Sequence, residues 1–115
     1  HVVATGYNGA PPGLEHCDDI GHLIQNMNGR DSCQRSTHAE QNAVFAAARF
    51  GHRLQGATAY ITARPCATCA KALLSAGIVK VLWAEDYGGV EGLDVLESAG
   101  ALYLRTRTWE VYAAA

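Results

Sequence analysis

The order of strand-like and helix-like segments in the second half of the chain restricts its fold more than any other feature. Residues that favour strands occupy 57–63, 78–84 and 101–106, and residues that favour helices occupy 67–76 and 90–99. When a helix connects two strands of one sheet, the connection is nearly always right-handed and the strands are parallel. This order therefore predicts an α/β fold whose last strands are parallel.

One more helix is expected before this region. Good helix formers run over 38–50 and end at Gly51, and Ser36 or Thr37 is the expected N-cap. This helix must pack on the same sheet, because the chain is too short to supply a second core. We therefore expect a three-layer α/β/α arrangement around a mixed sheet.

The first third of the chain predicts mostly loops. An extended segment at 2–5 runs into the glycine- and proline-rich stretch 6–13, and a single helical turn is expected at 20–24. Because His1 stands inside a segment that resembles a strand, we expect the sequence to be a fragment of a longer protein. No signal peptide is visible.

Size and composition restrict the class of protein. The length of 115 residues predicts one domain spanning 1–115. With 49% apolar and 17% charged residues, the chain has too much core material for intrinsic disorder. The net charge of −2 argues against binding to a long nucleic acid, and no apolar stretch reaches the roughly 18 residues that a membrane-spanning helix needs.

Two short motifs stand at predicted helix starts, His38-Ala-Glu40 and Pro65-Cys66-Ala-Thr-Cys69. Cys66 and Cys69 are three residues apart, so in a helical turn their side chains lie on one side, and His38 can meet them from the other helix. One imidazole and two thiolates suit zinc, and a site with three protein ligands keeps its fourth tetrahedral position for water. The motifs therefore predict a catalytic zinc site.

Glu40 is the expected general acid/base of this site. It follows His38 too closely to ligate the same ion comfortably, yet it is near enough to exchange protons with the metal's water. Each motif taken alone has another interpretation. A Cys-x-x-Cys pair also occurs in structural zinc sites and redox centres, and Thr37 to Glu40 also fits a capping box.

With these residues the chain resembles the zinc-dependent cytidine and deoxycytidylate deaminase superfamily, in which His-x-Glu and Pro-Cys-x-x-Cys motifs recur. The resemblance implies that a zinc-activated water attacks the amino-bearing ring carbon of a base. It assigns to Glu40 the transfer of protons to the ring nitrogen and to the departing ammonia. It also implies that a helix and a strand are missing before Gly6, since family members normally carry them there.

Several segments resemble one branch, the deoxycytidylate (dCMP) deaminases and the late-competence deaminase proteins of bacteria. These segments are Gly6-Tyr-Asn-Gly-Ala-Pro11, His38-Ala-Glu-Gln-Asn-Ala43, Ala76-Gly-Ile78 and Glu85-Asp-Tyr87. This resemblance implies hydrolysis of dCMP to dUMP and ammonia. It also implies that Asn8 binds the sugar, that the backbone around Ala39 and Arg64 reads the pyrimidine edge, and that Tyr87 walls the base pocket. An ordinary turn role for Asn8 and ordinary packing for Tyr87 are the alternatives.

Basic side chains near the motifs are candidates for the phosphate of such a substrate, because guanidinium groups bind phosphate through paired hydrogen bonds. They are Arg30, Arg35, Arg64 and Lys71. Solvated surface positions are the alternative role for most of them.

A second group of His and Cys residues lies in the loop-rich third, at His16, Cys17, His22 and Cys33. Some relatives of this branch carry an additional zinc in this region, and a structural zinc would order a segment with little core of its own. Cys17, His22 and Cys33 are the expected ligands. Buried or unpaired thiols are the alternative.

Other functions within and outside the superfamily stay open. A tRNA adenosine deaminase or a nucleoside or free-base deaminase is the first alternative, and a non-catalytic zinc-binding module is the second. The Gln41-Asn42 pair and the net charge of −2 disfavour the tRNA substrate, and Glu40 disfavours a purely structural zinc site. We expect a small-molecule nucleotide substrate, a homo-oligomer, and a reducing, cytoplasmic compartment.

Overall fold

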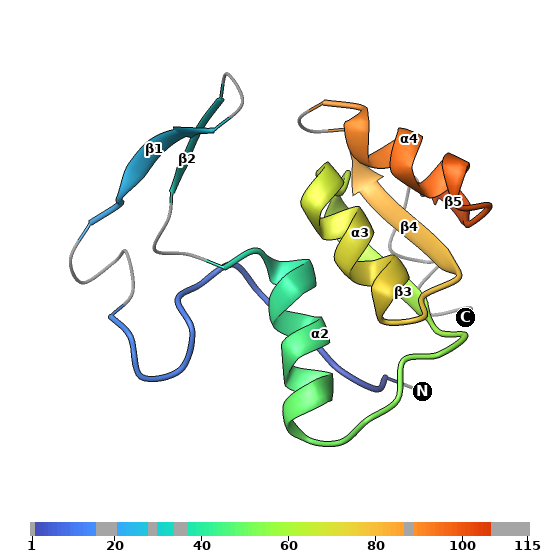
Figure 1. The fold of residues 1–115 in the computed structure, drawn as a ribbon, viewed down its shortest axis with the longest axis horizontal. Helices are drawn as coiled ribbons and strands as arrows, with labels where there is room; N and C mark the ends of the chain where they lie inside the picture. The colour runs from blue at the N-terminus through green and yellow to red at the C-terminus, as the bar shows by residue number, and fades with distance from the viewer. Residues whose placement is uncertain (1, 16–20, 28–29, 34–36, 87–88, 107–115) are drawn as a thin grey trace.

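The computed structural model of the chain describes residues 2–15, 21–27, 30–33, 37–86 and 89–106. Its elements follow one another in the order shown in Figure 1. They are β1 (Ile24–Met27), β2 (Arg30–Cys33), α2 (Ala39–Arg49), β3 (Thr58–Ala63), α3 (Ala67–Ser75), β4 (Lys80–Glu85), α4 (Glu91–Ser98) and β5 (Leu102–Arg105). The predicted alternation of strand and helix from β3 onward is confirmed, with boundaries that shift by one or two residues.

Two separate sheets are formed. Strands β3, β4 and β5 make a three-stranded sheet in which both neighbouring pairs are parallel, as predicted. Strands β1 and β2 form an antiparallel hairpin that stands apart from the parallel sheet in Figure 1. A mixed sheet was expected, but within the described residues the main sheet is entirely parallel. The antiparallel pairing occurs in the separate hairpin.

The core lies between the parallel sheet and its helices. Val81 and Trp83 of β4 are buried against apolar side chains of α3 and α4, which include Leu73 and Leu96. Helix α3 contacts both α4 and α2, and Figure 1 shows α2 beside α3, on the side away from α4. The opposite face carries Tyr60, whose side chain is exposed, and the second helical layer of the predicted three-layer arrangement does not occur within the described residues.

The start of α2 differs from the prediction. His38, rather than Ser36 or Thr37, occupies the N-cap position, and its side chain makes no capping hydrogen bond. The Ala39 N–H instead donates to Oδ1 of Asn8 at 2.8 Å. The cap was mispredicted because it comes from a residue 31 positions earlier in the chain, which no local pattern identifies. Ser36 lies outside the described residues.

Two expectations for the first third were wrong. Ile24 begins strand β1, and described residues 21–23 form no helical turn. Described residues 2–5 form no strand. The hairpin pairs Met27 with Arg30, and the Asn-Gly dipeptide at 28–29 between them is a sequence signal for such a hairpin.

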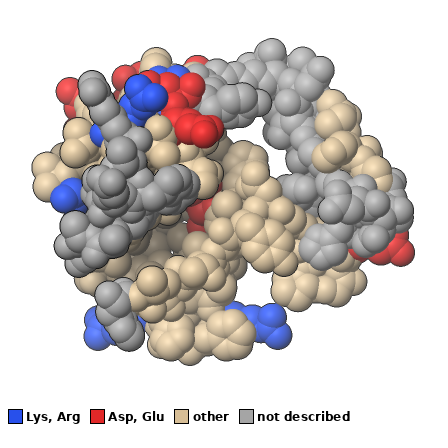
Figure 2. All heavy atoms as spheres, turned by 180° about the vertical axis from the view of Figure 1, so that it is seen from behind, with Lys and Arg blue, Asp and Glu red and all other residues tan. Residues whose placement is uncertain are grey.

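The charged surface seen from behind is mixed. On the face shown in Figure 2, the visible Lys and Arg side chains lie at separate places, and Asp and Glu side chains gather at the upper edge, with others near the centre and at the right. None of the helices in the described ranges has the length and apolar character needed to span a membrane.

Candidate metal centre

The metal-binding motifs meet at the starts of two helices. His38 is the N-cap of α2, and Cys66 is the N-cap of α3, directly after the loop that leaves β3. Cys69 lies in the first turn of α3 and is fully buried. Its backbone N–H donates to the Cys66 sulfur at 3.4 Å, which adds to the positive end of the helix dipole in stabilising a thiolate there.

The three donor atoms have the separation of a tetrahedral site. Nδ1 of His38 lies 3.2 Å from Sγ of Cys69 and 3.7 Å from Sγ of Cys66, and all three atoms are within 4.8 Å of one another. Zinc–nitrogen and zinc–sulfur bonds of about 2.1 and 2.3 Å at a tetrahedral angle place the ligand atoms about 3.6 Å apart. One nitrogen and two sulfurs therefore fit zinc, with one coordination position left open.

The protonation of the two thiols differs. Hydrogen bonds from Cys69 and His38 lower the pKa of Cys66 to about 4. The neighbouring Cys66, together with burial and the charge of Glu40, raises the pKa of Cys69 well above its ordinary value. The hydrogen bond to Cys66 also raises the pKa of His38, against the opposing effect of burial. Metal binding must therefore displace the proton of Cys69, since both sulfurs ligate as thiolates.

Glu40 lies beside the three donors without joining them. It is half-buried in the first turn of α2, and its hydrogen bond to the Cys69 thiol contributes to the raised pKa of that thiol. Its carboxylate is not part of the three-residue group whose ligand atoms converge. This position suits a group that exchanges protons with a ligand in the open coordination position.

The predicted substrate-binding backbone is already hydrogen-bonded. The Ala39 N–H donates to Asn8, and the Arg64 N–H donates to the carbonyl oxygen of Glu85 at 3.1 Å. The structure thus brings Asn8 directly to the metal-binding motif, because its partner Ala39 stands between His38 and Glu40 in the sequence. The backbone N–H groups of Ala39 and Arg64 are used within the protein.

The Arg64 side chain belongs to a charged cluster at the carboxyl ends of the parallel strands. Nη1 of Arg64 is 4.0 Å from the Asp86 carboxylate, and Nη1 of Arg105 is 3.5 Å from it. Trp83 donates from Nε1 to Asp86 at 2.9 Å, and this hydrogen bond is the main cause of the lowered pKa of Asp86. Sequence reasoning missed Asp86 and Arg105, although a charged residue at the end of each adjacent strand is a visible signal.

Other predicted site residues fall outside this centre or outside the description. Lys71 is exposed on α3, and His22 is exposed before β1. Cys17, Arg35 and Tyr87 lie outside the described residues, and so do the side chains of Arg30 and Cys33.

Helix α4 packs closely on the metal-binding loop. A Cβ atom on Gly92 would stand 2.0 Å from the carbonyl oxygen of Pro65 and 3.0 Å from that of Cys66. Only glycine allows this approach, because any side chain would displace the loop or the helix.

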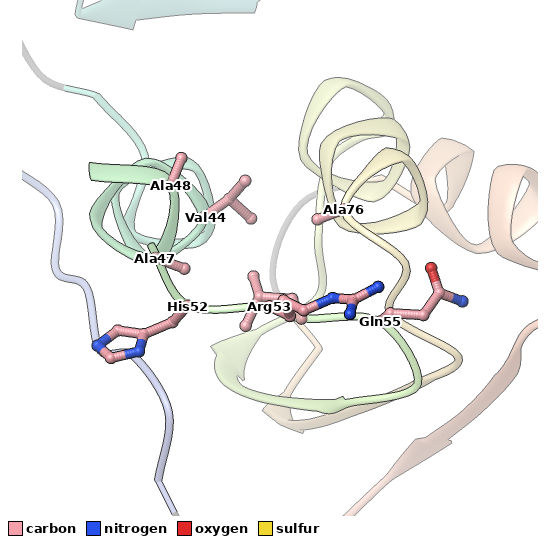
Figure 3. Close-up of a pocket in the computed structure, with 8 residues that line it drawn as sticks. Val44, Ala47, Ala48, His52, Arg53, Gln55 and Ala76 are labelled. Atoms are coloured by element: carbon pink, nitrogen blue, oxygen red, sulfur yellow. The ribbon is translucent and has the colours of Figure 1, made fainter. Parts of the chain in front are cut away.

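A separate pocket lies at the far end of α2, where Ala47, His52 and Arg53 line it (Figure 3).

The fold and the site define a class of protein, an α/β domain with an open three-ligand metal centre at helix starts and a carboxylate beside it. A family model described as the cytidine and deoxycytidylate deaminase zinc-binding region matches residues 1–85, and the chain belongs to this zinc-binding family. The family predicted from the two motifs is confirmed.

Individual relatives point to one branch of the family. ComE operon protein 2 of Bacillus subtilis is 43% identical over 86 residues, which cover 75% of this chain and 43% of that protein. The deoxycytidylate deaminase of phage T2 is 31% identical, over 75% of this chain and 64% of the phage protein. The chain thus spans between 43% and 64% of the length of these curated relatives.

A solved structure is similar to this chain and belongs to the same branch of the family. The dCMP deaminase from cyanophage S-TIM5 in complex with dCMP and dUMP matches with a TM-score of 0.75 and 28% identity, over 92% of this chain and 74% of that one. The cytidine-deaminase-like fold predicted from the sequence is therefore confirmed.

Proposed function

We propose that this protein hydrolyses dCMP to dUMP and ammonia. The observation that carries the proposal is the convergence of His38, Cys66 and Cys69 beside the carboxylate of Glu40, in a fold similar to that of a deaminase solved with dCMP and dUMP. Zinc held by these three side chains would supply a Lewis acid that lowers the pKa of a water molecule.

Residues of the chain transfer the protons and bind the substrate. Glu40 takes a proton from the attacking water and delivers it to the ring nitrogen of cytosine as oxygen bonds to the amino-bearing carbon. Glu40 then takes the remaining proton of the attacking oxygen and passes it to the amino group, which leaves as ammonia as its bond to carbon breaks and the carbon–oxygen double bond of dUMP forms. Asn8 uses Oδ1 on the Ala39 N–H, so its amide N–H groups remain to donate to an oxygen of the sugar. We assign the wall of the base pocket to Tyr87.

Arg64 is our candidate for the phosphate, because its side chain is held near the metal-binding loop. The Asp86 carboxylate fixes its position but also offsets part of its charge. On the face in Figure 2 the visible Lys and Arg side chains are separated and form no continuous basic surface of the kind that a long nucleic acid needs. Arg30, Arg35 and Lys71 are the other candidates.

The substrate test compares dCMP with deoxycytidine. We expect kcat/KM for dCMP to exceed that for deoxycytidine by about 10- to 100-fold, because one charge-assisted hydrogen bond to phosphate contributes about 1.5–3 kcal/mol. Ammonia release from each compound measures this, with cytosine and an adenosine-bearing tRNA loop as further substrates. A preference for the nucleoside would contradict the nucleotide specificity and leave the deamination mechanism standing.

We also propose a structural zinc bound by Cys17, His22 and Cys33. The register of the hairpin supports it, since Cys33 pairs with Ile24, which follows His22 by two residues. We expect more than one zinc per chain in the wild-type protein, and a decrease toward one in Cys33→Ser. Elemental analysis of the purified protein measures both values, and one zinc per chain in the wild type would contradict this site.

We also propose a cellular compartment and an oligomeric state for this protein. Two free cysteines that ligate zinc as thiolates favour a reducing, cytoplasmic compartment. Exposed apolar side chains on β5, Leu102 and Leu104, favour a homo-oligomer. Light scattering of the complete protein measures its oligomeric state.

A further inference from the structure

The segment Gly6–Gly9 lies directly against the first turns of α2. Gly9 and Thr37 exchange two backbone hydrogen bonds, of 3.2 and 2.8 Å. A Cβ atom on Gly6 would stand 2.4 Å from the carbonyl oxygen of Ala39 and 2.5 Å from the nitrogen of Ala43. The segment is thus in backbone contact with the helix that carries His38 and Glu40.

One side chain joins this segment to the helix. Nδ2 of Asn42 donates to the carbonyl oxygens of Tyr7 at 2.7 Å, Thr37 at 3.1 Å and Gly9 at 3.3 Å. All three neighbours are acceptors, so only the amide nitrogen can face them. Asn42 therefore connects both chain segments that meet at the start of α2, and the metal-site chemistry does not use it.

The contact made by Asn42 also places Asn8. Asn8 lies between Tyr7 and Gly9, whose carbonyl groups Asn42 holds, and its Oδ1 caps the Ala39 N–H. Ala39 stands between the metal ligand His38 and the proton carrier Glu40. A displacement of the Gly6–Gly9 segment would thus uncap the helix and move Asn8 away from the site.

We propose that Asn42 is a positioning residue that sets substrate affinity by holding the Gly6–Gly9 segment, and with it Asn8, against the start of α2. This rests on the proposed function insofar as Asn8 contacts the substrate. The backbone N–H of Asn42 donates to the carbonyl oxygen of His38 at 2.9 Å as part of the helix, but its side chain contacts neither the ligand atoms nor the reacting atoms. Its effect on catalysis passes through Asn8.

The test uses the zinc-loaded complete protein with Asn42→Ala, the isosteric Asn42→Asp and the control Gln41→Ala, which alters an amide in the same helical turn. In both Asn42 variants we expect faster hydrogen exchange at the Ala39 amide by at least about 10-fold, since its acceptor is displaced. We expect KM for dCMP to rise about 10-fold, with kcat changed less than about threefold and zinc content unchanged. Gln41→Ala should match the wild type in all four measurements.

A double-variant cycle separates this role from a purely structural one. If Asn42 acts through Asn8, then Asn42→Ala in an Asn8→Ala background raises KM little further, because the two effects are not additive. A lowered melting temperature with unchanged KM and unchanged Ala39 exchange would overturn the proposal, as would additive effects on KM. If Asn42→Ala does not fold, Asn42→Asp carries the same comparisons. Hydrogen exchange at Ala39 needs no substrate, so it tests the Asn42 contact even if the protein does not deaminate dCMP.

Discussion

Replacement of Glu40 by glutamine is expected to lower kcat for dCMP by about 10²- to 10⁴-fold, the usual effect of losing a general acid/base. Glutamine keeps the shape of the side chain but cannot carry a proton between water, ring nitrogen and leaving amine. The zinc content should stay at the wild-type value, because Glu40 lies outside the three-ligand group. Its negative charge also raises the pKa of Cys69, so the neutral variant eases deprotonation of that ligand.

The measurement pairs steady-state ammonia release with elemental analysis and a melting curve. Glu97→Gln, the same chemical change on the exposed surface of α4, is the matched control and should retain full activity. If Glu40→Gln lost zinc or stability as severely as activity, Glu40 would be a structural residue. Activity within a few-fold of the wild type would remove Glu40 from the mechanism.

Replacement of Cys69 by serine is expected to remove one zinc per chain and to reduce deamination to background. Loss of even an outer partner of a metal ligand typically weakens metal binding about 10- to 100-fold, so loss of the ligand should exceed 100-fold. Cys69 is fully buried, and its sulfur is 3.2 Å from Nδ1 of His38. Among the described residues, no Cys, His, Asp or Glu besides His38 and Cys66 joins the converging group, so none stands ready to replace Cys69 as a ligand. The metal-binding loop should also lose stability, since zinc would join α2 to α3.

Chelator competition followed by elemental analysis measures this loss. Thr68→Ala changes an exposed residue between the two cysteines and should keep both zinc and activity. Full zinc content in both Cys69→Ser and Cys66→Ser would show that the ion is bound elsewhere. Retained activity in a zinc-free variant would contradict the metal-assisted mechanism.

The fold of the second half was predictable because its signals are local. Strand-favouring and helix-favouring stretches alternate from residue 57 onward, and the preference for right-handed crossovers then determines parallel pairing in β3, β4 and β5. The hairpin β1–β2 was missed although an Asn-Gly dipeptide marks it. The local signal for this hairpin lies in its turn, because Asn-Gly favours a two-residue hairpin loop, while the residues of β1 and β2 are mostly polar.

The metal centre was predictable for a different reason. His38, Cys66 and Cys69 are residue types with strong metal-ligand chemistry, and each stands in a short motif at a helix start. Ligand identity and spacing within a helical turn are properties of the sequence itself, so the composition of the site could be predicted before its geometry was known. The role proposed for Glu40 followed from its spacing to His38.

The sequence by itself determined the α/β class, the family and the three residues that can hold zinc. Only the tertiary structure decided that Asn8 caps α2, that Asn42 joins the Gly6–Gly9 segment to that helix, and that Asp86 lies between Arg64 and Arg105. These contacts join residues up to 35 positions apart, and each depends on how separately formed elements pack and in which register strands align. Amide and carboxylate side chains suit many surface roles, so their partners become defined only when the fold brings particular donors and acceptors together.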